Sequence, residues 1–555
     1  MKIPQPIREL LEVRGVSGEE DIRKFLFPKL KDLPSPELLK NLPEAVHLIA
    51  QYILARKKII VWGDYDVDGT TATALLIQFF KEFDFKAEWH IPNRLKEGYG
   101  LNIEWFKANK QIMFKEDFLV ITVDCGISDS IVIDEIQKMG GEVIVTDHHS
   151  IKKNSLPNCL ILNPNQKDCG FYGYKLAGVG VAFYLAAGLK IELNKNNVIG
   201  SCKINLKQYL GFVALGTIAD LVELTPINRI MVRGGLEALS ETKIVGLKAL
   251  LQTCDIRSGQ IHSEDIGFLI GPRINAAGRL GKAGVVLRLL TEADPRQARR
   301  LAEKLTAFNE ERKKLTLLCL ENALTIADKE IISSNKCVVV TGDIHLGVAG
   351  IVASKLVELN NLPAIVFSKK MNDDGSISYI GSARSIEDVS IIELFDNCSK
   401  YIMKYGGHDM AAGLTVSAEN KQEFEKLFIS FARESVKKIA QVKSRKHDIV
   451  CPISLLMSEN YLDILSKFEP YGPGNEQPVF LDSSACVVDS RKVGRGAEHL
   501  NVTFRGKFSN YKGIGFGLGN RLNEIQNNPT RTTLYTPTRN RFRGNVSWQV
   551  RVIDI

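Results

Sequence analysis

The segment Gly63-Asp64-Tyr65-Asp66-Val67-Asp68-Gly69 organises the interpretation of the whole chain. Residues 58–62 before it are apolar and β-branched, which predicts a buried strand, and residues 70–83 after it show helical spacing of apolar residues. Three carboxylates therefore lie where a strand passes into a helix, at the edge of an α/β sheet that binds ligands. Like charges this close repel one another, and an oxygen-ligated divalent metal is the usual solution. A solvated acidic turn is the alternative.

Length and composition indicate a multidomain globular protein. The chain has 555 residues, of which 45% are hydrophobic and 25% charged, so two to four domains are expected. Ten cysteines without a C-x-x-C pair argue against zinc and against a disulfide framework. Residues 1–6 lack the apolar core of a secretory signal, and no apolar run reaches membrane-spanning length. We expect a cytoplasmic protein.

The positive charge is concentrated near the C-terminus. Between Arg491 and Arg551 the chain carries twelve Lys/Arg against two acids, a local net charge of +10 that exceeds the +8 of the whole chain. Such an uneven distribution favours an appended module that binds a polyanion. A basic solvated surface is the alternative.

Strand and helix patterns alternate from residue 58 to about residue 225. Residues 1–57 before them read as helices and loops, with helical pieces at 19–27 and 42–55. The alternation predicts a parallel, doubly wound α/β sheet. The expected strands are 58–62, 87–91, 118–123, 142–146 and 159–162, and the helices between and after them include 70–83, 129–139, 176–188 and 210–219.

Polar residues follow three of these strands. Asp124-Cys125-Gly126 follows one strand and Asp147-His148-His149 follows the next, while Asp220 ends the helix-like stretch at 210–219. A parallel sheet brings its strand C-termini to one edge, so these residues are expected to meet the acidic turn at 63–69. Three strand ends carrying Asp or His favour the metal site over a solvated turn.

A second polar cluster lies at Gly271-Pro272-Arg273-Ile274-Asn275-Ala276-Ala277-Gly278-Arg279. Arginines among Gly and Ala indicate backbone close to a phosphate, with guanidinium groups to bind it. A helix cap with surface arginines is the alternative. Residues 294–335 then form a helical connector with a roughly heptad-spaced stripe, and coiled-coil dimerisation is poorly supported because the stripe spans only three heptads.

Residues 336–440 have the pattern of a second, smaller α/β unit. Glycines lie beside cationic or hydroxyl residues in three places, where backbone N–H groups and side chains can approach an anion together. Each place alone is more often a turn, but together they indicate a phosphate-binding face. Its candidate residues are His345, Ser382, Arg384, Gly406, Gly407 and His408.

The C-terminal part, 441–555, begins with a basic linker and is rich in β-branched and aromatic residues. Five expected strands, at 479–488, 499–508, 511–518, 533–537 and 546–553, fit a small barrel of the OB type. Aromatic rings interleave with the basic residues, which is typical of single-strand nucleic-acid binding. About half of these rings are expected to be barrel core. They are Phe504, Phe508, Tyr511, Phe516, Tyr535, Phe542 and Trp548.

These motifs resemble those of the DHH phosphoesterase family. Asp64-x-Asp66-x-Asp68-Gly69, Asp124-Cys125-Gly126, Asp147-His148-His149 and Ala219-Asp220 are similar to its four motifs. Further stretches look like its bacterial single-strand-specific 5′→3′ DNA exonuclease branch. They include 271–280, 382–385, 406–408 and 470–475. The resemblance implies a helical segment (1–57), a DHH domain (58–293), a connector helix (294–335), a DHH-associated domain (336–440) and an OB domain (441–555).

The resemblance also implies a site and a mechanism. Two Mn²⁺ or Mg²⁺ ions would promote phosphodiester hydrolysis. The implied metal ligands are Asp66, Asp68, Asp124, His148 and Asp220. Asp64 would be a ligand or orient one, and His149 would contact the scissile phosphate or orient a ligand. The implied phosphate- and DNA-binding residues are Arg273, Asn275, Arg279, His345, Ser382, Arg384, Gly406, Gly407 and His408.

The implied activity is release of 5′-mononucleotides from single-stranded DNA with a free 5′ end, in DNA recombination and repair. A single-strand-binding protein and a RecQ-type helicase are the implied partners, and we expect a monomer without membrane contact. The alternatives are a DHH phosphoesterase for nano-RNA, pAp or cyclic dinucleotides, which needs no basic barrel, and a non-catalytic DNA-binding scaffold, which would have lost motif carboxylates. One departure from the branch is Asp343-Ile344, where a bulky aromatic is expected before His345.

Overall fold

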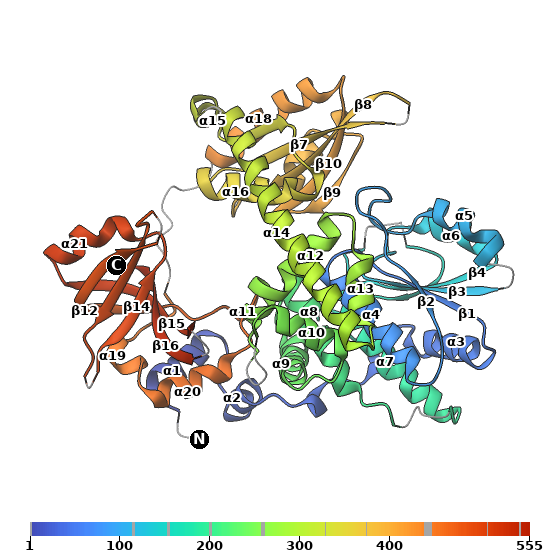
Figure 1. Cartoon of the computed structure of the whole chain (residues 1–555), viewed down its shortest axis with the longest axis horizontal. Coiled ribbons are helices and arrows are strands. Elements are labelled where there is room, and N and C mark those ends of the chain that lie inside the picture. Colours follow the sequence, from blue (N-terminus) through green and yellow to red (C-terminus); the bar gives the residue numbers. More distant parts are fainter. Residues whose placement is uncertain are drawn as a thin grey trace.

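A computed structural model describes residues 3–113, 117–151, 156–198, 203–256, 261–327, 329–372, 374–437, 447–494, 496–507, 509–542 and 545–555. Figure 1 shows an α/β domain in blue to green, a smaller α/β domain in yellow and orange, and a barrel in red. The long helix α14 joins the two α/β domains. Among the described residues, no helix is both long enough and apolar enough to cross a membrane.

The first domain is built on a five-stranded sheet in the order β2-β1-β3-β4-β5, and all its pairs are parallel. This confirms the predicted parallel sheet. The order reverses between β1 and β3, which makes that point the expected ligand crevice. The strands are β1 (Lys58–Trp62), β2 (Glu88–His90), β3 (Phe118–Val123), β4 (Gly141–Thr146) and β5 (Leu160–Leu162).

Helices cover both faces of this sheet. The central helix is α4 (Val67–Lys81), of which nearly every side chain is buried, because α7 and α8 pack along it. The opposite face is covered by α5 and α6, whose Phe106 and Ile133 belong to a separate apolar cluster with Trp62. The other helices of this domain are α3 (Leu42–Leu54), α5 (Ile103–Met113), α6 (Ser130–Lys138), α7 (Gly178–Lys195), α8 (Leu210–Ala219), α9 (Pro226–Ser240), α10 (Val245–Thr253) and α13 (Gly284–Leu290).

The second polar cluster, residues 271–279, forms a helix, so its glycines and arginines lie on helical backbone. A short α11 (Ser263–Asp265) runs through a π-helical turn, η5 (Ile266–Ile270), into α12 (Gly271–Arg279). Pro272 lies in the first turn of α12, directly after the π-helical turn. Gly278 is required by packing, because a methyl group there would lie 2.4 Å from the carbonyl oxygen of Tyr65.

The connector is α14 (Pro295–Ile326), a helix of 32 residues capped by the Asp294 side chain. At 1.5 Å per residue it is about 48 Å long. Its N-terminal half packs on α10, α12 and α13 of the first domain, and its C-terminal half packs on α16 and β6 of the second. A short helix, α15 (Lys329–Asn335), follows it.

The second α/β domain has a mixed sheet in the order β6-β7-β8-β10-β9. Residues 381–385 and 405–408, the glycine-containing segments expected to form a phosphate-binding face, lie largely in strands β8 and β9, which pair antiparallel with β10. The elements are β6 (Val338–Gly342), α16 (Leu346–Asn360), β7 (Ala364–Met371), β8 (Ile377–Arg384), α17 (Ile391–Asn397), β9 (Lys404–His408), β10 (Ala411–Ser417) and α18 (Lys421–Lys437).

The C-terminal domain is a closed five-stranded barrel, as predicted. Its strands pair in the order β12-β13-β14-β16-β15, and β15 returns to β12 to close it. The strands are β12 (Phe480–Val493), β13 (His499–Phe504), β14 (Tyr511–Gly515), β15 (Thr530–Phe542) and β16 (Asn545–Asp554), with β11 (Ile449–Val450) added to β12. The helices in this domain are α19 (Ile453–Leu456), α20 (Glu459–Leu465) and α21 (Leu522–Asn527).

Part of the predicted aromatic stripe is core. Phe504 and Tyr535 are fully buried, and Tyr511 and Trp548 pack partly against the barrel core. Phe516 is 59% exposed. Phe508, residues 438–446 of the basic linker and the side chain of Phe542 lie outside the described residues.

The N-terminal helices pack on the barrel. Apolar residues of α1 (Gln5–Val13) and α2 (Glu19–Leu26) join the barrel's hydrophobic cluster, whereas α3 joins that of the first domain. The helical segment predicted for 1–57 is therefore divided between two cores. The nine cysteines that the structure describes are all free.

Candidate active site

The acidic turn joins β1 to α4, and one of its carboxylates caps the helix. Asp66 is the N-cap of α4, where its Oδ1 accepts from the Gly69 N–H at 3.0 Å. A side chain at Gly69 would lie 2.5 Å from the Asp64 backbone nitrogen, so glycine is needed for the turn to close. The turn thereby holds Asp64 at 3% exposure beside Asp66.

Asp124 follows β3 in a left-handed backbone conformation, with φ of 62°. Its N–H donates to the Thr146 carbonyl at 3.0 Å, which keeps it aligned with β4. Gly178 faces it so closely that a methyl group would lie 2.7 Å from Asp124 Cβ. A non-glycine residue in this region is uncommon, and such strain clusters at functional sites.

Asp68 lies in the first turn of α4 but faces the N-terminus of another helix. Its two oxygens accept from the N–H groups of Gly178 at 2.6 Å and Val179 at 2.9 Å, the first residues of α7. Because a helix N-terminus carries partial positive charge, α7 stabilises the buried carboxylate. Gly216 of α8 also approaches it, and a methyl group there would lie 2.5 Å from Asp68 Oδ1.

His148 joins these carboxylates from the end of β4. Its Nε2 lies 3.1 Å from Asp124 Oδ1, 3.6 Å from Asp220 Oδ2 and 3.8 Å from Asp68 Oδ2. Asp220 is the C-cap residue of α8. Side chains spread over more than 150 residues of sequence thus meet at one sheet edge.

Asp147 and His149 form a supporting pair. Asp147 Oδ1 accepts from the N–H groups of His148 and His149 and lies 2.7 Å from His149 Nδ1. Its Oδ2 accepts from Ile127 N at 3.0 Å. Burial lowers the pKa of His149, but the hydrogen bond and charge of Asp147 outweigh burial and raise that pKa to about 9. The ring is therefore cationic at neutral pH.

Burial and neighbouring carboxylates disfavour ionisation of the acidic cluster without a cation. Burial first, and then the other carboxylates, raise the pKa of Asp68 to about 7 and that of Asp220 to about 8. The pKa values of Asp64 and Asp124 are raised for the same reasons. Burial, together with the charge of His149, lowers the pKa of His148 to about 4, so its imidazole is neutral and able to bind a metal.

The residues present fit two divalent metal ions. Three buried atoms of this cluster, Asp64 Oδ1, Asp124 Oδ1 and His148 Nε2, make no hydrogen bond of normal geometry, although the last two lie 3.1 Å apart. Ligand atoms come together in two adjoining groups, one of Asp64, Asp66 and Asp124 and one of Asp68, His148 and Asp220. Asp124 also groups with His148 and His149, so it lies between the two positions. Carboxylates with one imidazole suit Mn²⁺ or Mg²⁺.

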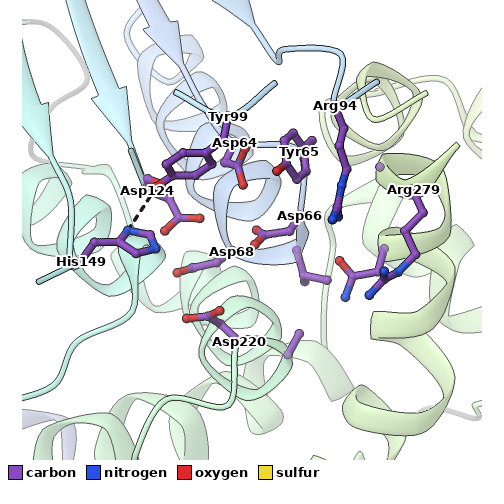
Figure 2. A pocket seen from close by; sticks show the side chains of 14 residues that line it. Asp64, Tyr65, Asp66, Asp68, Arg94, Tyr99, Asp124, His149, Asp220 and Arg279 are labelled. Atoms are coloured by element: carbon purple, nitrogen blue, oxygen red, sulfur yellow. Dashed lines mark hydrogen bonds between the residues drawn. The ribbon is translucent and has the colours of Figure 1, made fainter. Parts of the chain in front are cut away.

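Across a cleft of about 300 Å³, Arg94 and Arg279 lie on one side of the carboxylates and Tyr99 and His149 on the other (Figure 2). We call Arg94, Arg279 and the nearby Arg384 the cationic wall. Arg279 Nη1 donates to the Gly347 carbonyl at 3.1 Å, so α12 meets the start of α16 at this point. Burial, and then the charges of Arg94 and Arg384, lower the pKa of Arg279 to about 10, which shows that these guanidinium groups act on one another.

The other predicted phosphate-binding residues are distributed around this cleft. Asn275 lines it with Arg279. Arg273 is not among its lining residues, because its Nη1 donates to the Leu269 carbonyl at 2.6 Å and its Nε to Thr306 Oγ1 at 3.3 Å. His345 caps α16 by accepting from Gly347 N at 3.0 Å.

Ser382 and Arg384 project from β8 beside the start of α16. A methyl group at Gly350 would lie 2.8 Å from Arg384 Nη2 and 3.0 Å from Ser382 Oγ. Gly406, Gly407 and His408 lie on the exposed edge strand β9. The charge of His408 contributes to the lowered pKa of His148, which places β9 within electrostatic range of the cleft.

Sequence reasoning missed three cleft residues: Tyr65, Arg94 and Tyr99. Arg94 and Tyr99 lie in the loop after β2. The Arg94 guanidinium carbon lies over the Tyr65 ring, 5.1 Å from the ring centroid. Tyr99 Oη donates to the Asp124 carbonyl at 3.1 Å. For Arg94 and Tyr99 the available signal was a polar loop with two glycines, Gly98 and Gly100, directly after an expected strand.

Known families match the three domains in order. The DHH family N-terminal domain matches residues 58–217, the DHHA1 domain residues 334–434 and the RecJ OB domain residues 447–554. With the acidic and histidine cluster at the sheet edge, fold and site define a metal-dependent phosphoesterase of the DHH class.

The similar proteins narrow this class. Curated relatives named single-stranded-DNA-specific exonuclease RecJ include those of Haemophilus influenzae, 31% identical over 95% of this chain and 93% of the relative, and Escherichia coli, 31% identical over 100% and 96%. A Bacillus subtilis relative is 34% identical over 92% of this chain, which spans 63% of its length. The chain belongs to the RecJ family.

Solved structures agree with this assignment. RecJ from Thermus thermophilus in complex with Mn²⁺ is 28% identical, has a TM-score of 0.78, and is matched over 100% of this chain and 78% of its own. The same protein in complex with Mg²⁺ has a TM-score of 0.71 at 27% identity, with 100% of this chain and 77% of its own covered.

Proposed function

We propose that the chain is a metal-dependent exonuclease that hydrolyses single-stranded DNA from a free 5′ end and releases 5′-mononucleotides, in DNA recombination and repair. The observation that carries this proposal is the buried carboxylate–histidine cluster, which Arg94 and Arg279 face across the cleft, with Arg384 in electrostatic range of Arg279. Membership of the RecJ family and the C-terminal barrel support single-stranded DNA as the substrate.

Asp64, Asp66 and Asp124 would hold one Mn²⁺ or Mg²⁺ ion, and Asp68, His148 and Asp220 the other. Such ions supply Lewis-acid polarisation of the phosphate and a water nucleophile at neutral pH. Asp68 is held in place by the N-terminus of α7, and His148 is kept neutral by burial. Of the two roles expected for Asp64, ligand or orienting residue, this proposal takes the ligand role, because Asp64 groups with Asp66 and Asp124.

His149 binds or protonates the reacting phosphate group. Its Nδ1 is engaged by Asp147, so the proton on its other nitrogen is available to the cleft that His149 lines. Because its pKa is raised to about 9, the imidazolium neutralises charge that develops on the phosphate. Asp147 thus acts as the residue that orients His149.

The cationic wall accounts for 5′ polarity. Arg94, Arg279 and Arg384 come from three separate segments; the first two line the cleft at one end of the carboxylate cluster (Figure 2), and Arg384 lies within electrostatic range of both. A terminal 5′-phosphate offers more charge and more oxygens than an internal phosphodiester, so converging guanidinium groups select the strand end. Ser382, His345 and the β9 edge with Gly406, Gly407 and His408 would bind the neighbouring phosphates.

Partners and location belong to the same proposal. A single-strand-binding protein and a RecQ-type helicase would supply the single strand, and the enzyme would act as a cytoplasmic monomer. Sedimentation of the purified chain tests whether it is a monomer. Gel-shift competition on single-stranded DNA coated with single-strand-binding protein tests that protein as a partner. A stable dimer or complete inhibition by coating would overturn these assignments.

The activity is tested with single-stranded DNA labelled at either end. With Mn²⁺, release of a labelled 5′-mononucleotide should precede any loss of the 3′ label, and EDTA should abolish release. A 5′-phosphorylated strand should be degraded faster than a 5′-hydroxyl strand. Release from the 3′ end first, or equal rates on a cyclic dinucleotide, would refute the assignment.

A further inference from the structure

One sequence motif is not used by the cleft, namely residues 470–475 just before the barrel. It forms a tight hairpin in which Gly472 N donates to the Asn475 carbonyl at 3.1 Å and Asn475 N donates back at 2.9 Å. Asn475 is 4% exposed, and its Nδ2 donates to the carbonyls of Phe468 and Pro470 at 2.8 and 2.7 Å. Arg14 of the N-terminal segment donates to Asn475 Oδ1 at 2.6 Å. The hairpin is therefore rigidly held.

The hairpin docks on the loop that follows α8 in the first domain. The Leu224 N–H donates to the Pro473 carbonyl at 2.7 Å. Leu224 is buried and packs against Gly472. A methyl group added at Gly472 would lie 3.1 Å from Leu224 Cδ1. Gly474 has φ of 75°, and a methyl group there would lie 2.5 Å from Glu223 Cγ. Glycines at both positions let the two backbones approach.

The same loop begins at Asp220. Leu221 has a left-handed φ of 56°, an uncommon conformation for leucine, and Val222 N donates back to the Thr217 carbonyl at 3.2 Å. Such a conformation persists where surrounding contacts over-determine it. Asp220 Oδ2 points into the cleft, 3.6 Å from His148 Nε2.

We propose that the hairpin 470–475 is a positioning element for the metal ligand Asp220. It clamps residues 223–224 so that the strained turn at Leu221 stays closed and the Asp220 carboxylate stays aimed at the metal position. The barrel thus supports the metal centre mechanically as well as offering a surface for DNA. This inference rests on the proposed role of Asp220 as a ligand.

A matched pair of glycine substitutions tests the clamp. Gly474→Ala strains the backbone and pushes on Glu223, whereas Gly140→Ala has a comparable φ of 89° with nothing within 4 Å of the added methyl group. Mn²⁺ binding to the DNA-free full-length chain is titrated by the electron paramagnetic resonance signal of free Mn²⁺. We expect Gly474→Ala to weaken one of two Mn²⁺ sites about 10-fold, as outer-shell changes do, and Gly140→Ala to leave both unchanged.

A second-site change separates positioning from general destabilisation. Glu223→Ala removes the atom that the new methyl group would strike, so the double variant Glu223→Ala/Gly474→Ala should regain Mn²⁺ affinity to within about twofold of Glu223→Ala alone. If Gly474→Ala does not fold, Gly472→Ala, which pushes on Leu224 without a positive φ, takes its place. Wild-type Mn²⁺ affinity in a folded variant, or absence of rescue, overturns the proposal.

The readout is independent of the proposed activity. If the wild-type chain binds two Mn²⁺ ions but cleaves no DNA, the proposed function fails while the clamp is still tested. If it cleaves DNA and Gly474→Ala binds Mn²⁺ normally, the clamp alone fails. DNA affinity measured with Ca²⁺ should be the same in wild type and variant, because the hairpin acts through Asp220.

Discussion

At the scale of single residues, the site is a set of acids that the fold forces together. Asp64, Asp68 and Asp124 are each at most 3% exposed and lie beside one another. Burying several ionised carboxylates together costs free energy, and a bound cation offsets that cost. The cluster is therefore stable in its ionised form only when metal is present.

Asp124→Asn tests the ligand assignment. Outer-shell changes already cost about 10- to 100-fold in metal affinity or activity, so loss of a central ligand should lower kcat on single-stranded DNA by more than about 100-fold. Because the cationic wall is untouched, the DNA dissociation constant in Ca²⁺ should change little. Turnover near the wild-type rate would remove Asp124 from the metal site.

The raised pKa values predict a pH dependence of the metal-free protein. The pKa of Asp220 is about 8 when folded and near 3.8 in an unfolded chain, so the folded state holds more protons between these values. The stability contribution is therefore present below about pH 4 and is lost as pH rises through 8. In EDTA, thermal denaturation should show Tm falling from pH 5 to 9, with a smaller fall in Asp220→Asn. Saturating Mn²⁺ should abolish the difference, and equal slopes without metal would exclude Asp220 as the titrating group.

Arg384→Ala tests the origin of polarity. A hydrogen bond to a charged group contributes about 1.5–3 kcal/mol, so the preference for 5′-phosphate over 5′-hydroxyl DNA should fall by about 10- to 100-fold. The exposed Arg288→Ala on α13 is the matched control and should leave this preference intact. An equal loss on both substrates would assign Arg384 to general DNA binding instead.

At the scale of elements, helix ends and glycines set the geometry. The N-terminus of α7 holds Asp68, and the C-terminus of α8 presents Asp220. Both helices pack on α4, which begins at the acidic turn, so three helices determine where the carboxylates meet. Close packing of these helices depends on glycine.

Gly216→Ala on α8 tests this dependence. The methyl group would lie 2.5 Å from Asp68 Oδ1, so Mn²⁺ affinity in a calorimetric titration should fall about 10-fold or more. Gly180→Ala on α7 meets its neighbours at 3.5 Å or more and should instead stabilise the helix by about 0.5–1 kcal/mol. Equal effects of the two substitutions on Mn²⁺ binding would remove the steric explanation.

At the scale of the whole molecule, the two ends of the chain form one unit. Ile7, Leu10 and Leu11 of α1 and Ile22 and Leu26 of α2 are buried in the barrel's core cluster. Removing the barrel alone would expose these side chains. Some basic residues of the barrel are also committed to ion pairs: Arg521 and Arg531 with Glu524, and Arg539 with Glu469.

Paired truncations test the barrel's role in DNA binding. The chain limited to 41–440 lacks both the barrel and the helices that pack on it, and should stay soluble where 1–440 aggregates. Its DNA affinity should be weaker and less salt-dependent than that of the full chain, because each lost phosphate contact lowers the slope of log K against log salt by about 0.9, or about 0.7 for single strands. An unchanged slope would assign DNA binding to the two α/β domains.

Much of this architecture was predictable because its signals are local. The strands at 58–62 and 118–123 match β1 and β3 residue for residue, since short β-branched runs of this length favour strands buried on both faces. The segment Gly271–Arg279 was ambiguous, because Gly and Pro weaken a helical pattern that packing on α14 restores. Residues 381–384 form a strand because antiparallel partners satisfy their backbone, which no local pattern reveals.

The sequence alone was sufficient to predict the class of site, because a parallel sheet obliges Asp64, Asp124 and His148 to share one edge. Only the tertiary structure shows that Arg94 lines the cleft and that Arg273 does not. It also places the hairpin 470–475 against the loop that begins at Asp220. These positions depend on contacts between residues far apart in the chain. Such contacts arise from side-chain packing, in which each residue's position depends on all its neighbours. The spacing of residues along the sequence does not reveal these long-range contacts.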